Sequence, residues 1–381
     1  METTFRDSFP DYDSLAEEDT SERPNGLHEH LRVITPSVDI SKYEKLNTIS
    51  EGSFGIVFRA KLNSAIHPGR FFAVKKLKSK YTSNKREGFS HSVLREINIL
   101  RNCCHINIVK VIEICVDSVH DVYLVMEFAP TDIKSWQRSH VAHDRQLNMS
   151  HIKNVLRQLL HGVSYLHGNS LVHRDLKTSN LLITHDGVLK LCDFGLCRAI
   201  PDKKDDKSAW TPQVMTMLYR CPEVLMREQS LYSKAIDIWS VGIIFAELVL
   251  GHPPFVRCMK EPLAPDSAEA ELEMFRELVD NLGPPSCIDE FCGNNYGRSL
   301  VSKSEVDDSS VGSLYDGLKS KLTPLGVDFL LLMLHWDPRQ RPSATDALDH
   351  PFFAEAPLAC ANSELPEIVN SHAEKGESKD V

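Results

Sequence analysis

The sequence predicts an α+β fold in which a small β-rich part precedes a larger, mainly helical part. Up to about residue 128 the chain has short runs rich in Val, Ile and Phe, which are typical of strands. From residue 152 onward, apolar residues return at the three- and four-residue spacing of amphipathic helices. The change of pattern places the join between the two parts at about residues 129–135.

The β-rich part contains three strand-like stretches and one helix. Residues 43–62 have strand-like residues on both sides of a glycine-containing turn, and residues 71–77 form a second β-type run. Residues 122–128 are a continuous apolar run, which indicates a buried strand. Between these runs, residues 92–101 have helical spacing.

The second part begins with a predicted helix over residues 152–166. Two short β-type runs follow at 181–183 and 188–191, and helical patterns dominate from residue 236. The longest apolar run, Ile236 to Leu250, includes Asp237 and Glu247 and is too short and polar to span a bilayer. Residues 300–317 are rich in Ser, Asp and Gly and predict a surface loop.

The net charge of −10 lies mainly in the two ends of the chain. Residues 1–40 hold ten Asp or Glu against three Lys or Arg, and residues 354–381 hold six against two. We therefore expect a disordered acidic tail over 1–42 and a flexible acidic tail over 354–381. The body is nearly neutral, which argues against direct binding of nucleic acid. The start of the chain has no apolar segment typical of a secretory signal, so the ten cysteines are expected to be reduced thiols.

Three motifs carry the chemistry. Residues 173–180 read His-Arg-Asp-Leu-Lys-Thr-Ser-Asn, residues 193–195 read Asp-Phe-Gly, and residues 221–223 read Cys-Pro-Glu. Their order and spacing resemble the catalytic loop, the metal-binding triplet and the end of the activation segment of protein kinases. The resemblance implies a two-lobed kinase domain over residues 43–353. Its N-lobe, with a five-stranded sheet, would span 43–129 and its helical C-lobe 130–353.

The resemblance also assigns roles in phosphate transfer to Ser or Thr. Asp175 would orient or accept the proton of the substrate hydroxyl, and Lys177 would reach the transferred phosphate. Thr216 would bridge these two side chains. Asn180 and Asp193 would supply oxygen ligands to Mg²⁺, which is a hard cation.

A separate argument concerns Glu96 in the helix predicted over 92–101. Val93, Ile97 and Leu100 form its inward stripe, and Glu96 lies within that stripe. A buried carboxylate needs a partner, and Lys75 in the run Ala-Val-Lys is the natural candidate. Lys76 would point to the other face of the strand. The alternative is that Glu96 lies at the rim of the stripe and faces solvent.

Residues 49–57 resemble the glycine-rich loop that covers the phosphates of ATP. The family pattern has a third glycine where this chain has Ser50, while Gly52 and Gly55 are present. The apolar walls of the adenine site would include Met126 at the gatekeeper position, with the hinge at residues 127–129. The full set of nucleotide-binding residues that the resemblance implies is Ile49, Ser50, Glu51, Gly52, Ser53, Phe54, Gly55, Ile56, Val57, Ala73, Lys75, Glu96, Met126, Glu127, Ala129, Asp132 and Leu182.

Residues 88–97 resemble the PSTAIRE-type helix of cyclin-dependent kinases and are most similar to the PITSLRE, or cyclin-dependent kinase 11-like, subgroup. This implies activation by a cyclin, of the L type in that subgroup, and by phosphorylation of Thr211. Three arginines would receive the phosphate, namely Arg95, Arg174 and Arg198. The alternative is that these arginines pair with local carboxylates at residues 202–206.

Several positions depart from the family pattern. Met215, Met217 and Leu218 replace the usual Val, Leu and Trp near the substrate groove, and a preference for Ser or Thr followed by Pro is expected from the resemblance. Phe54 replaces an inhibitory tyrosine. Cys221 replaces Ala, while Glu223 and Arg341 match a structural salt bridge.

The function predicted from the sequence is therefore a cyclin-dependent serine/threonine kinase that uses ATP and Mg²⁺. Its partners would be a cyclin and protein substrates, with no nucleic acid and no membrane. The resemblance places it in the nucleus, with the cytoplasm as a second compartment, in cell-cycle or transcription and RNA-processing control. The main alternative is a pseudokinase scaffold that binds nucleotide or a cyclin, and the intact Lys75, Glu96, Asp175, Asn180 and Asp193 argue against it. A mitogen-activated-type kinase is a second alternative, but its activation loop usually has a Thr-x-Tyr pair, and residues 211–213 read Thr-Pro-Gln and lack that tyrosine.

Overall fold

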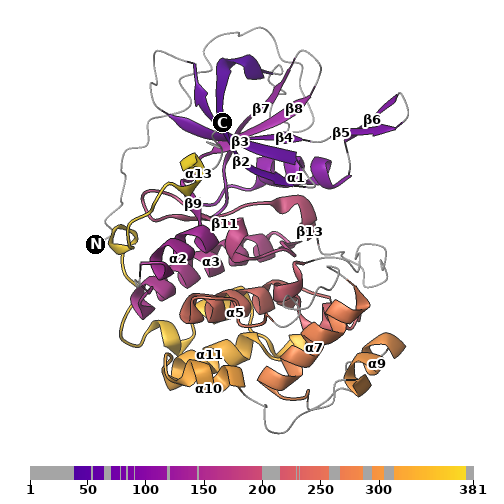
Figure 1. Ribbon diagram of the computed structural model, residues 1–381, viewed down its shortest axis with the longest axis vertical. Helices are drawn as coiled ribbons and strands as arrows, with labels where there is room; N and C mark the ends of the chain where they lie inside the picture. Colours follow the sequence, from indigo (N-terminus) through magenta and orange to yellow (C-terminus); the bar gives the residue numbers. More distant parts are fainter. Residues whose placement is uncertain are drawn as a thin grey trace, which may run out of the picture. The chain divides into compact units, whose positions relative to one another are not determined.

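The computed structural model divides the chain into two units, Met1–Pro36 and Ser37–Val381. All residues that it describes belong to the second unit. They are residues 38–52, 55–63, 70–77, 79–82, 85–89, 91–117, 121–143, 146–199, 215–228, 230, 232–256, 267–285, 294–303 and 313–374. Figure 1 shows the sheet-bearing part at the top and the helices below it.

The N-terminal part is a six-stranded sheet in the order β1-β7-β8-β4-β3-β2. Its strands are β1 (Val38–Asp39), β2 (Tyr43–Gly52), β3 (Gly55–Leu62), β4 (Phe71–Leu77), β7 (Val111–Val116) and β8 (Val122–Glu127). The helix α1 (His91–Asn102) and the hairpin β5 (Ser79–Thr82) and β6 (Lys85–Phe89) complete this part. The strands from β2 to β8 pair in antiparallel fashion, so this sheet is built from hairpins and one excursion through α1.

The sixth strand corrects the predicted five-stranded sheet. Val38 and Asp39 pair in parallel with Cys115 and Val116 of β7. A short 3-10 turn, η2 (Ile40–Lys42), then leads into β2. The prediction of a disordered tail up to residue 42 is therefore wrong for residues 38–42, because pairing with the sheet edge holds them. The rest of that tail lies outside the described residues.

The C-terminal part is mainly helical. Its helices are α2 (Ile133–Val141), α3 (Met149–Gly168), α4 (Pro222–Leu225), α5 (Ala235–Leu250), α7 (Ala268–Leu282), α9 (Asn295–Lys303), α10 (Ser313–Lys319), α11 (Pro324–Met333), α12 (Ala344–Leu348) and α13 (Ser371–Glu374). Five short strands lie between its helices and the sheet-bearing part, namely β9 (Thr131–Asp132), β10 (Leu171–Val172), β11 (Leu181–Ile183), β12 (Leu189–Leu191) and β13 (Arg198–Ala199). None of the described helices is long and apolar enough to cross a membrane.

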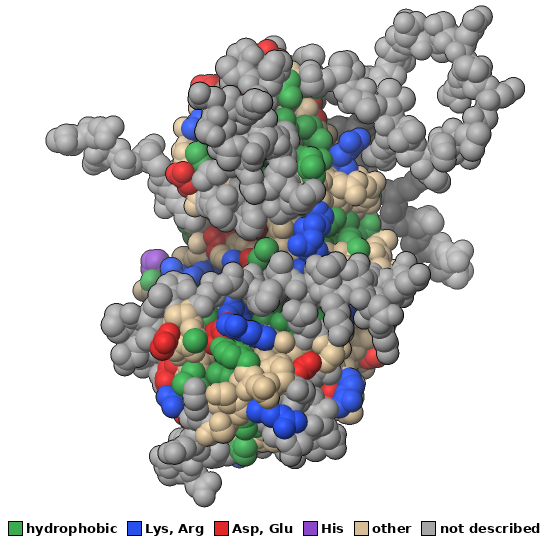
Figure 2. Space-filling model, turned by 90° about the vertical axis from the view of Figure 1, so that its right-hand side faces the viewer, with side chains coloured by type: hydrophobic (Ala, Val, Ile, Leu, Met, Phe, Trp, Pro, Cys, Tyr) green, Lys and Arg blue, Asp and Glu red, His purple; other side chains and the backbone are tan. Residues whose placement is uncertain are grey.

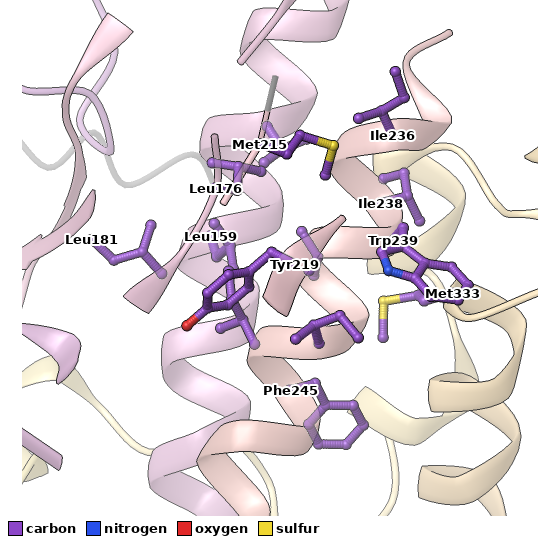
Figure 3. Packing of buried hydrophobic residues seen from close by; sticks show 14 of the residues in the cluster. Leu159, Leu176, Leu181, Met215, Tyr219, Ile236, Ile238, Trp239, Phe245 and Met333 are labelled. Carbon is purple, nitrogen blue, oxygen red and sulfur yellow. The ribbon is translucent and has the colours of Figure 1, made fainter. Parts of the chain in front are cut away.

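Helix α5 is the centre of the C-terminal core. Its residues from Ile236 to Val249 are all buried, as expected for a helix that has apolar residues on every side. Trp239 and Phe245 of α5 pack with residues of neighbouring elements such as Leu159 of α3 and Met333 of α11 (Figure 3). The helix is capped by Gly251, whose φ of 87° is in the left-handed region that favours glycine.

Two predictions for the C-terminal part are wrong. Residues 300–317 were expected to form a loop, but α9 and α10 occupy the described residues at both ends of that range. The tail predicted from residue 354 is not flexible over residues 354–374, which pack along α3 and end at α13 beside the sheet (Figure 1). Side chains of the folded domain bond to the backbone of this segment, and such contacts leave no hydrophobic periodicity to predict them.

Candidate active site

A cavity of about 410 Å³ opens between the sheet and the helical part. Most of the predicted nucleotide-binding and catalytic residues line it, although they come from distant parts of the chain. The predicted residues in its wall are Ile49, Ser50, Gly55, Val57, Ala73, Lys75, Glu96, Met126, Glu127, Ala129, Asp132, Asp175, Lys177, Asn180, Leu182 and Asp193. The cavity is large enough for a small-molecule ligand of nucleotide size.

Lys75 and Glu96 form a buried ion pair at the back of the cavity. Lys75 Nζ lies 2.5 Å from Glu96 Oε1 and 3.5 Å from Asp193 Oδ1. Burial alone would lower the pKa of Lys75, but the carboxylates of Glu96 and Asp193 outweigh burial and raise it. The lysine is therefore a fixed positive charge, and Glu96 faces the cavity rather than solvent.

The strand alternation explains why Lys75, and not its neighbour, faces this cavity. Lys75 lies opposite Val57 of β3 and Leu124 of β8 in the sheet register. Lys76 points to the other face, where its ammonium lies 2.7 Å from Asp121 Oδ2.

Asp175 is held by donors on both of its oxygens. Oδ1 accepts hydrogen bonds from Thr216 N at 3.2 Å and Thr216 Oγ1 at 2.9 Å. Oδ2 accepts from Lys177 Nζ at 2.7 Å and from Asn180 Nδ2 at 3.1 Å. Lys177 Nζ also donates to Thr216 Oγ1 at 2.9 Å, so the bridge expected of Thr216 is present. The four side chains form one network with a fixed carboxylate at its centre.

A buried aspartate in α5 fixes the backbone of this loop. Asp237 Oδ2 accepts from the N–H of His173 and Asp237 Oδ1 from the N–H of Arg174, each at 2.9 Å. His167 Nε2 lies 2.9 Å from the same carboxylate. Arg174 has a φ of 69°, a conformation that a non-glycine residue keeps only when its surroundings hold it. The strain at Arg174 is thus offset by Asp237.

Asn180 and Asp193 fit a magnesium ion by the chemistry of their donors. The Asn180 amide nitrogen donates to the Asp175 carbonyl at 2.9 Å and to its carboxylate, which commits that nitrogen and leaves the amide oxygen as the available ligand. The Asp193 carboxylate lines the same cavity with a third of its side chain exposed. Two oxygen donors beside a cavity match the preference of Mg²⁺ for hard ligands.

The segment that resembles a glycine-rich loop is the β2–β3 hairpin. Gly55 is required there, because a Cβ atom at this position would lie 2.2 Å from the Lys76 carbonyl oxygen. Ser50 lies in β2 opposite Val57, where extended backbone accepts any side chain. The serine therefore imposes no strain. Glu51, Gly52 and Ile56 belong to the hairpin but not to the cavity wall, and Ser53 and Phe54 lie outside the described residues.

The expected adenine and ribose ends of the cavity lie on adjacent strands. Ala73 of β4 is opposite Met126 of β8, and Leu182 of β11 is opposite Asp132 of β9. Asp132 also caps α2, accepting from Ser135 N at 2.9 Å and Ser135 Oγ at 2.8 Å. The Ala129 N–H donates no hydrogen bond to any of the described residues. This hinge donor is therefore available to a ligand.

Among the three arginines predicted to receive a phosphate, the charge of Arg198 affects the pKa values of the other two. Burial, followed by the charge of Arg198, lowers the pKa of Arg174 to about 10, and the same two causes lower the pKa of Arg95. On the face in Figure 2, Lys and Arg side chains gather at the level between the sheet and the helices. Thr211 and residues 202–206 lie outside the described residues.

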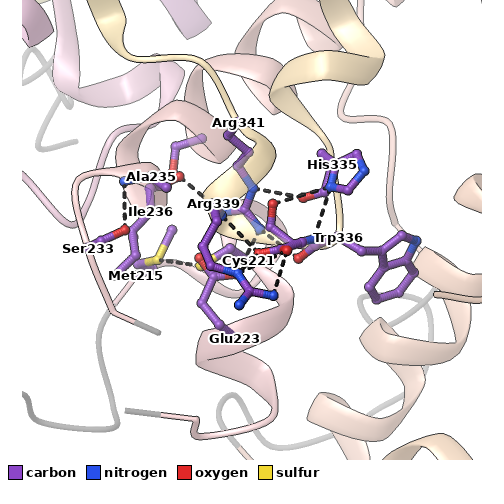
Figure 4. Close-up of polar contacts among 12 residues, drawn as sticks. Met215, Cys221, Glu223, Ser233, Ala235, Ile236, His335, Trp336, Arg339 and Arg341 are labelled. Carbon is purple, nitrogen blue, oxygen red and sulfur yellow. Dashed lines mark hydrogen bonds and ion pairs between the residues drawn. The ribbon is translucent and has the colours of Figure 1, made fainter. Parts of the chain in front are cut away.

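Glu223 and Arg341 form a buried pair below the site (Figure 4). Arg341 donates from both terminal nitrogens to the two Glu223 oxygens, at 2.7 and 2.8 Å, and neither side chain is exposed. Cys221, next to Glu223, is fully buried and lies 4.0 Å from the Met215 sulfur. This region is structural, since none of these side chains lines the cavity.

Sequence reasoning did not include five residues in the cavity wall: Leu100, Val109, Ser179, Cys192 and His372. Leu100 was predicted only as part of the inward stripe of its helix, and Cys192 directly precedes Asp193 in the chain. Burial raises the pKa of the Cys192 thiol, which keeps it protonated and favours a packing role. His372 lies in the segment expected to be flexible, so no sequence signal pointed to it.

A sheet-bearing part over a helical part, with this lysine, these carboxylates and this asparagine around one cavity, defines the protein kinase class. A sequence model described as the protein kinase domain matches residues 43–353, and the chain belongs to this family.

The most similar curated proteins include cyclin-dependent kinases. Cyclin-dependent kinase G-1 of Oryza sativa subsp. indica is 34% identical over 96% of this chain and 51% of its own length. Human cyclin-dependent kinase 11B is 34% identical over 95% of this chain and 42% of its own length. Human cyclin-dependent kinase 9 is 34% identical over 88% of this chain and 85% of its own length, which shows the cyclin-dependent kinase family. The chain thus spans about half the length or less of the first two relatives.

Proposed function

We propose that this chain is a serine/threonine protein kinase of the cyclin-dependent type, which transfers the γ-phosphate of ATP to protein hydroxyls. The observation that carries the proposal is the network around Asp175, in which Lys177, Asn180 and Thr216 all bond to one carboxylate beside the cavity. The closed Lys75–Glu96 pair supports an arrangement ready for phosphate transfer.

The cavity residues account for the binding of ATP with Mg²⁺. The apolar side chains of Val57, Ala73 and Leu182 offer walls for the purine, and the Ala129 N–H is a donor for its edge. Lys75 offers a positive charge for the phosphates. Asn180 and Asp193 would hold the metal, which supplies charge neutralisation when bound.

In the proposed reaction, the substrate hydroxyl oxygen forms a bond to the γ-phosphorus while the bond from that phosphorus to the β,γ-bridging oxygen breaks. ADP leaves with the bridging oxygen, and the hydroxyl proton passes to the Asp175 carboxylate. Lys177 lies 2.7 Å from that carboxylate and can offset negative charge on the transferred group. Thr216 keeps both side chains in position.

The backbone at Met215 supports a preference for proline after the phosphorylated residue. Met215 has a φ of 71°, and its carbonyl oxygen accepts a hydrogen bond from Arg220 at 3.0 Å. This acceptor is therefore not available to a backbone N–H of a bound peptide. Proline lacks that N–H, so it avoids the cost of an unsatisfied donor.

Exposed apolar side chains support a cyclin partner on the side of α1. Leu94 of α1 is 50% exposed and Ile106, four residues after that helix, is 65% exposed. Large apolar groups in such positions favour a protein interface, since contact would remove them from water. The resemblance to the PITSLRE subgroup favours an L-type cyclin. Phosphorylation of Thr211, received by Arg95, Arg174 and Arg198, would complete activation.

The same resemblance is the basis for proposing a nuclear protein, with the cytoplasm as a second compartment, that acts in cell-cycle or transcription and RNA-processing control. Names of the relatives support a cyclin-dependent kinase in general terms. Fractionation of cells that express the full chain would test the nuclear assignment, and a chain confined to the cytoplasm would contradict it.

Phosphate transfer to matched peptides tests the proposed class. The full chain, purified with its cellular partner, is incubated with labelled Mg-ATP and three peptides that differ only in Ser, Thr or Tyr at the acceptor position. We expect label on the Ser and Thr peptides and an identified cyclin in the purified sample. Label on the Tyr peptide alone would contradict the proposed acceptor class.

A further inference from the structure

Residues 354–374, here named the C-terminal segment, run from the base of the helical part back to the cavity. Side chains of the domain bond to its backbone along the whole path. Lys153 Nζ donates to the Glu355 carbonyl at 2.8 Å, Asn154 Nδ2 to the Cys360 carbonyl at 2.9 Å, and Trp136 Nε1 to the Glu367 carbonyl at 3.2 Å. The segment is thus anchored before it reaches α13, which contacts β2 (Figure 1).

The segment ends by placing His372 at the hinge. His372 is 5% exposed, its N–H donates to the Pro130 carbonyl at 3.0 Å, and Asn47 of β2 donates to its carbonyl at 2.7 Å. The ring Nδ1 lies 2.8 Å from the Ala129 carbonyl oxygen, 243 residues away in sequence. A carbonyl only accepts, so Nδ1 carries a proton and donates. These contacts tie the sheet, the hinge and the C-terminal segment together.

The second ring nitrogen faces Asp132. His372 Nε2 lies 3.5 Å from Asp132 Oδ2, and both residues line the cavity. The two donors of Ser135 hold the carboxylate from the α2 side, while His372 closes the opposite side. Burial would raise the pKa of the Asp132 carboxyl, but a hydrogen bond from His372 and the two bonds from Ser135 lower it, so an ionised carboxylate is held at this end of the cavity. The hydroxyl groups of a sugar match the acceptor oxygens of a carboxylate that is held in place.

We propose that His372 is a nucleotide-positioning residue that orients Asp132 and, together with it, favours a ribose over a deoxyribose at this end of the cavity. The inference rests on the proposed function, since it takes ATP as the occupant. It places part of the nucleotide site outside residues 43–353, in a segment that reaches the cavity only through the fold. It also implies that the Ala129 carbonyl accepts a hydrogen bond from His372 before any ligand binds.

Nucleotide binding to the full chain with its copurified partner tests this inference. Calorimetry gives the Kd of Mg-ATP, Mg-2′-deoxy-ATP and Mg-3′-deoxy-ATP for the wild type, His372→Ala and His372→Asn. We expect His372→Ala to raise the Kd of Mg-ATP about three- to tenfold, which is the effect of losing about one hydrogen bond. The variant should also show a smaller preference for ATP over at least one deoxy analogue. His372→Asn keeps a donor for the Ala129 carbonyl but lacks Nε2, so its Kd should lie in between.

Kinetics and a control variant separate positioning from folding. His372→Ala should raise the KM for ATP with kcat within about twofold of wild type, because Asp175 is untouched. Ser150→Ala removes a bond to the Leu358 carbonyl in the same segment, far from the cavity, and should leave both Kd and ribose preference unchanged. The double variant Asp132→Asn with His372→Ala should weaken ATP binding by less than the sum of the two single free-energy changes, since the residues act as a pair.

The outcomes distinguish this inference from the proposed function. Unchanged ATP affinity and ribose preference in His372→Ala, with a wild type that binds and transfers phosphate, would overturn the inference alone. An equal loss of affinity for ATP and for both deoxy analogues would also overturn it, because His372 would then stabilise the fold without affecting recognition of the sugar. A wild type that binds no nucleotide would overturn the proposed function and the inference together.

Discussion

The ammonium of Lys75 lies 2.5 Å from Glu96 Oε1, and both side chains are buried beside the cavity. This contact joins β4 to α1, so the position of the helix decides whether the lysine is correctly placed. The same ammonium lies 3.5 Å from Asp193 Oδ1 and thereby links the helix to the Asp-Phe-Gly triplet. If the proposed function is correct, activity requires this ion pair, which gives the first prediction.

Glu96→Gln should lower kcat/KM about 10- to 100-fold, which corresponds to about 1.4–2.8 kcal/mol of transition-state stabilisation. The neutral amide keeps the shape of the side chain but no longer holds the ammonium by charge. Steady-state phosphate transfer with the partner bound measures the effect. Glu113→Gln, whose carboxylate pairs with Lys42 outside the cavity, is the matched control and should change activity less. Equal effects of the two changes would contradict the role of Glu96.

Arg341→Ala should destabilise the chain by about 3–5 kcal/mol, because it leaves the Glu223 carboxylate buried without its charged partner. Urea unfolding of the variant and the wild type measures this difference. Arg339→Ala in the same turn removes a pair with Asp337 whose arginine is 57% exposed, and should cost at most about 1 kcal/mol. A similar loss of unfolding free energy in both variants would contradict the prediction, because burial of the Glu223–Arg341 pair would then make no difference.

Arg220→Ala should weaken the preference for proline after the acceptor by about tenfold. Without the arginine, the Met215 carbonyl can accept the backbone N–H of another residue at that position. Rates on peptide pairs with Pro or Ala after Ser measure the ratio. Arg227→Ala is the control, since Arg227 shares the partner Glu271 with Arg220 but has no bond to Met215. An unchanged ratio in Arg220→Ala would refute the proposed basis of the preference.

Asp237 should contribute stability that depends on pH. Burial would raise its pKa, but hydrogen bonds from His167 and the Arg174 N–H, with nearby histidine charge, hold it below its ordinary value of 3.8. A carboxyl with a depressed pKa stabilises the fold above that ordinary value and loses this contribution as the pH falls through the folded pKa. Urea midpoints from pH 3 to 7 should therefore show the largest gap between wild type and Asp237→Asn above about pH 4.

The exposed Asp328→Asn is the reference for this pH series and should follow the wild-type curve. A gap between wild type and Asp237→Asn that widens toward pH 3 would contradict the sign of the prediction.

The sequence predicted the centre of the site because its residues occur in short motifs with fixed spacing. Asp175, Lys177 and Asn180 lie within six residues, and a loop of this length can bring them together in few ways. Lys75 and Glu96 could be paired because strand alternation and the helical stripe each turn one charged side chain inward. Local periodicity was sufficient for these residues.

Other features depend on contacts between distant parts of the chain. His372 reaches Ala129 through a segment whose backbone is held by side chains of α2 and α3, and nothing in residues 354–374 has a periodic pattern. Val38 and Asp39 join the sheet by backbone pairing, which two residues cannot signal in sequence. The helices over 295–303 and 313–319 contain Ser and Gly that favour a loop locally, and tertiary packing of Leu300 and Leu314 outweighs that preference.

The most direct test of the central claim is a comparison of phosphate transfer by the wild type and by Asp175→Asn. Both chains are purified with the cellular partner and given Mg-ATP with a library of Ser-Pro and Thr-Pro peptides. The asparagine keeps the size of the side chain but removes the acceptor of the hydroxyl proton, so we expect a loss of at least about 100-fold in kcat with ATP binding retained. A wild type with bound cyclin and phosphorylated Thr211 that transfers no phosphate, or an asparagine variant as active as the wild type, would contradict it.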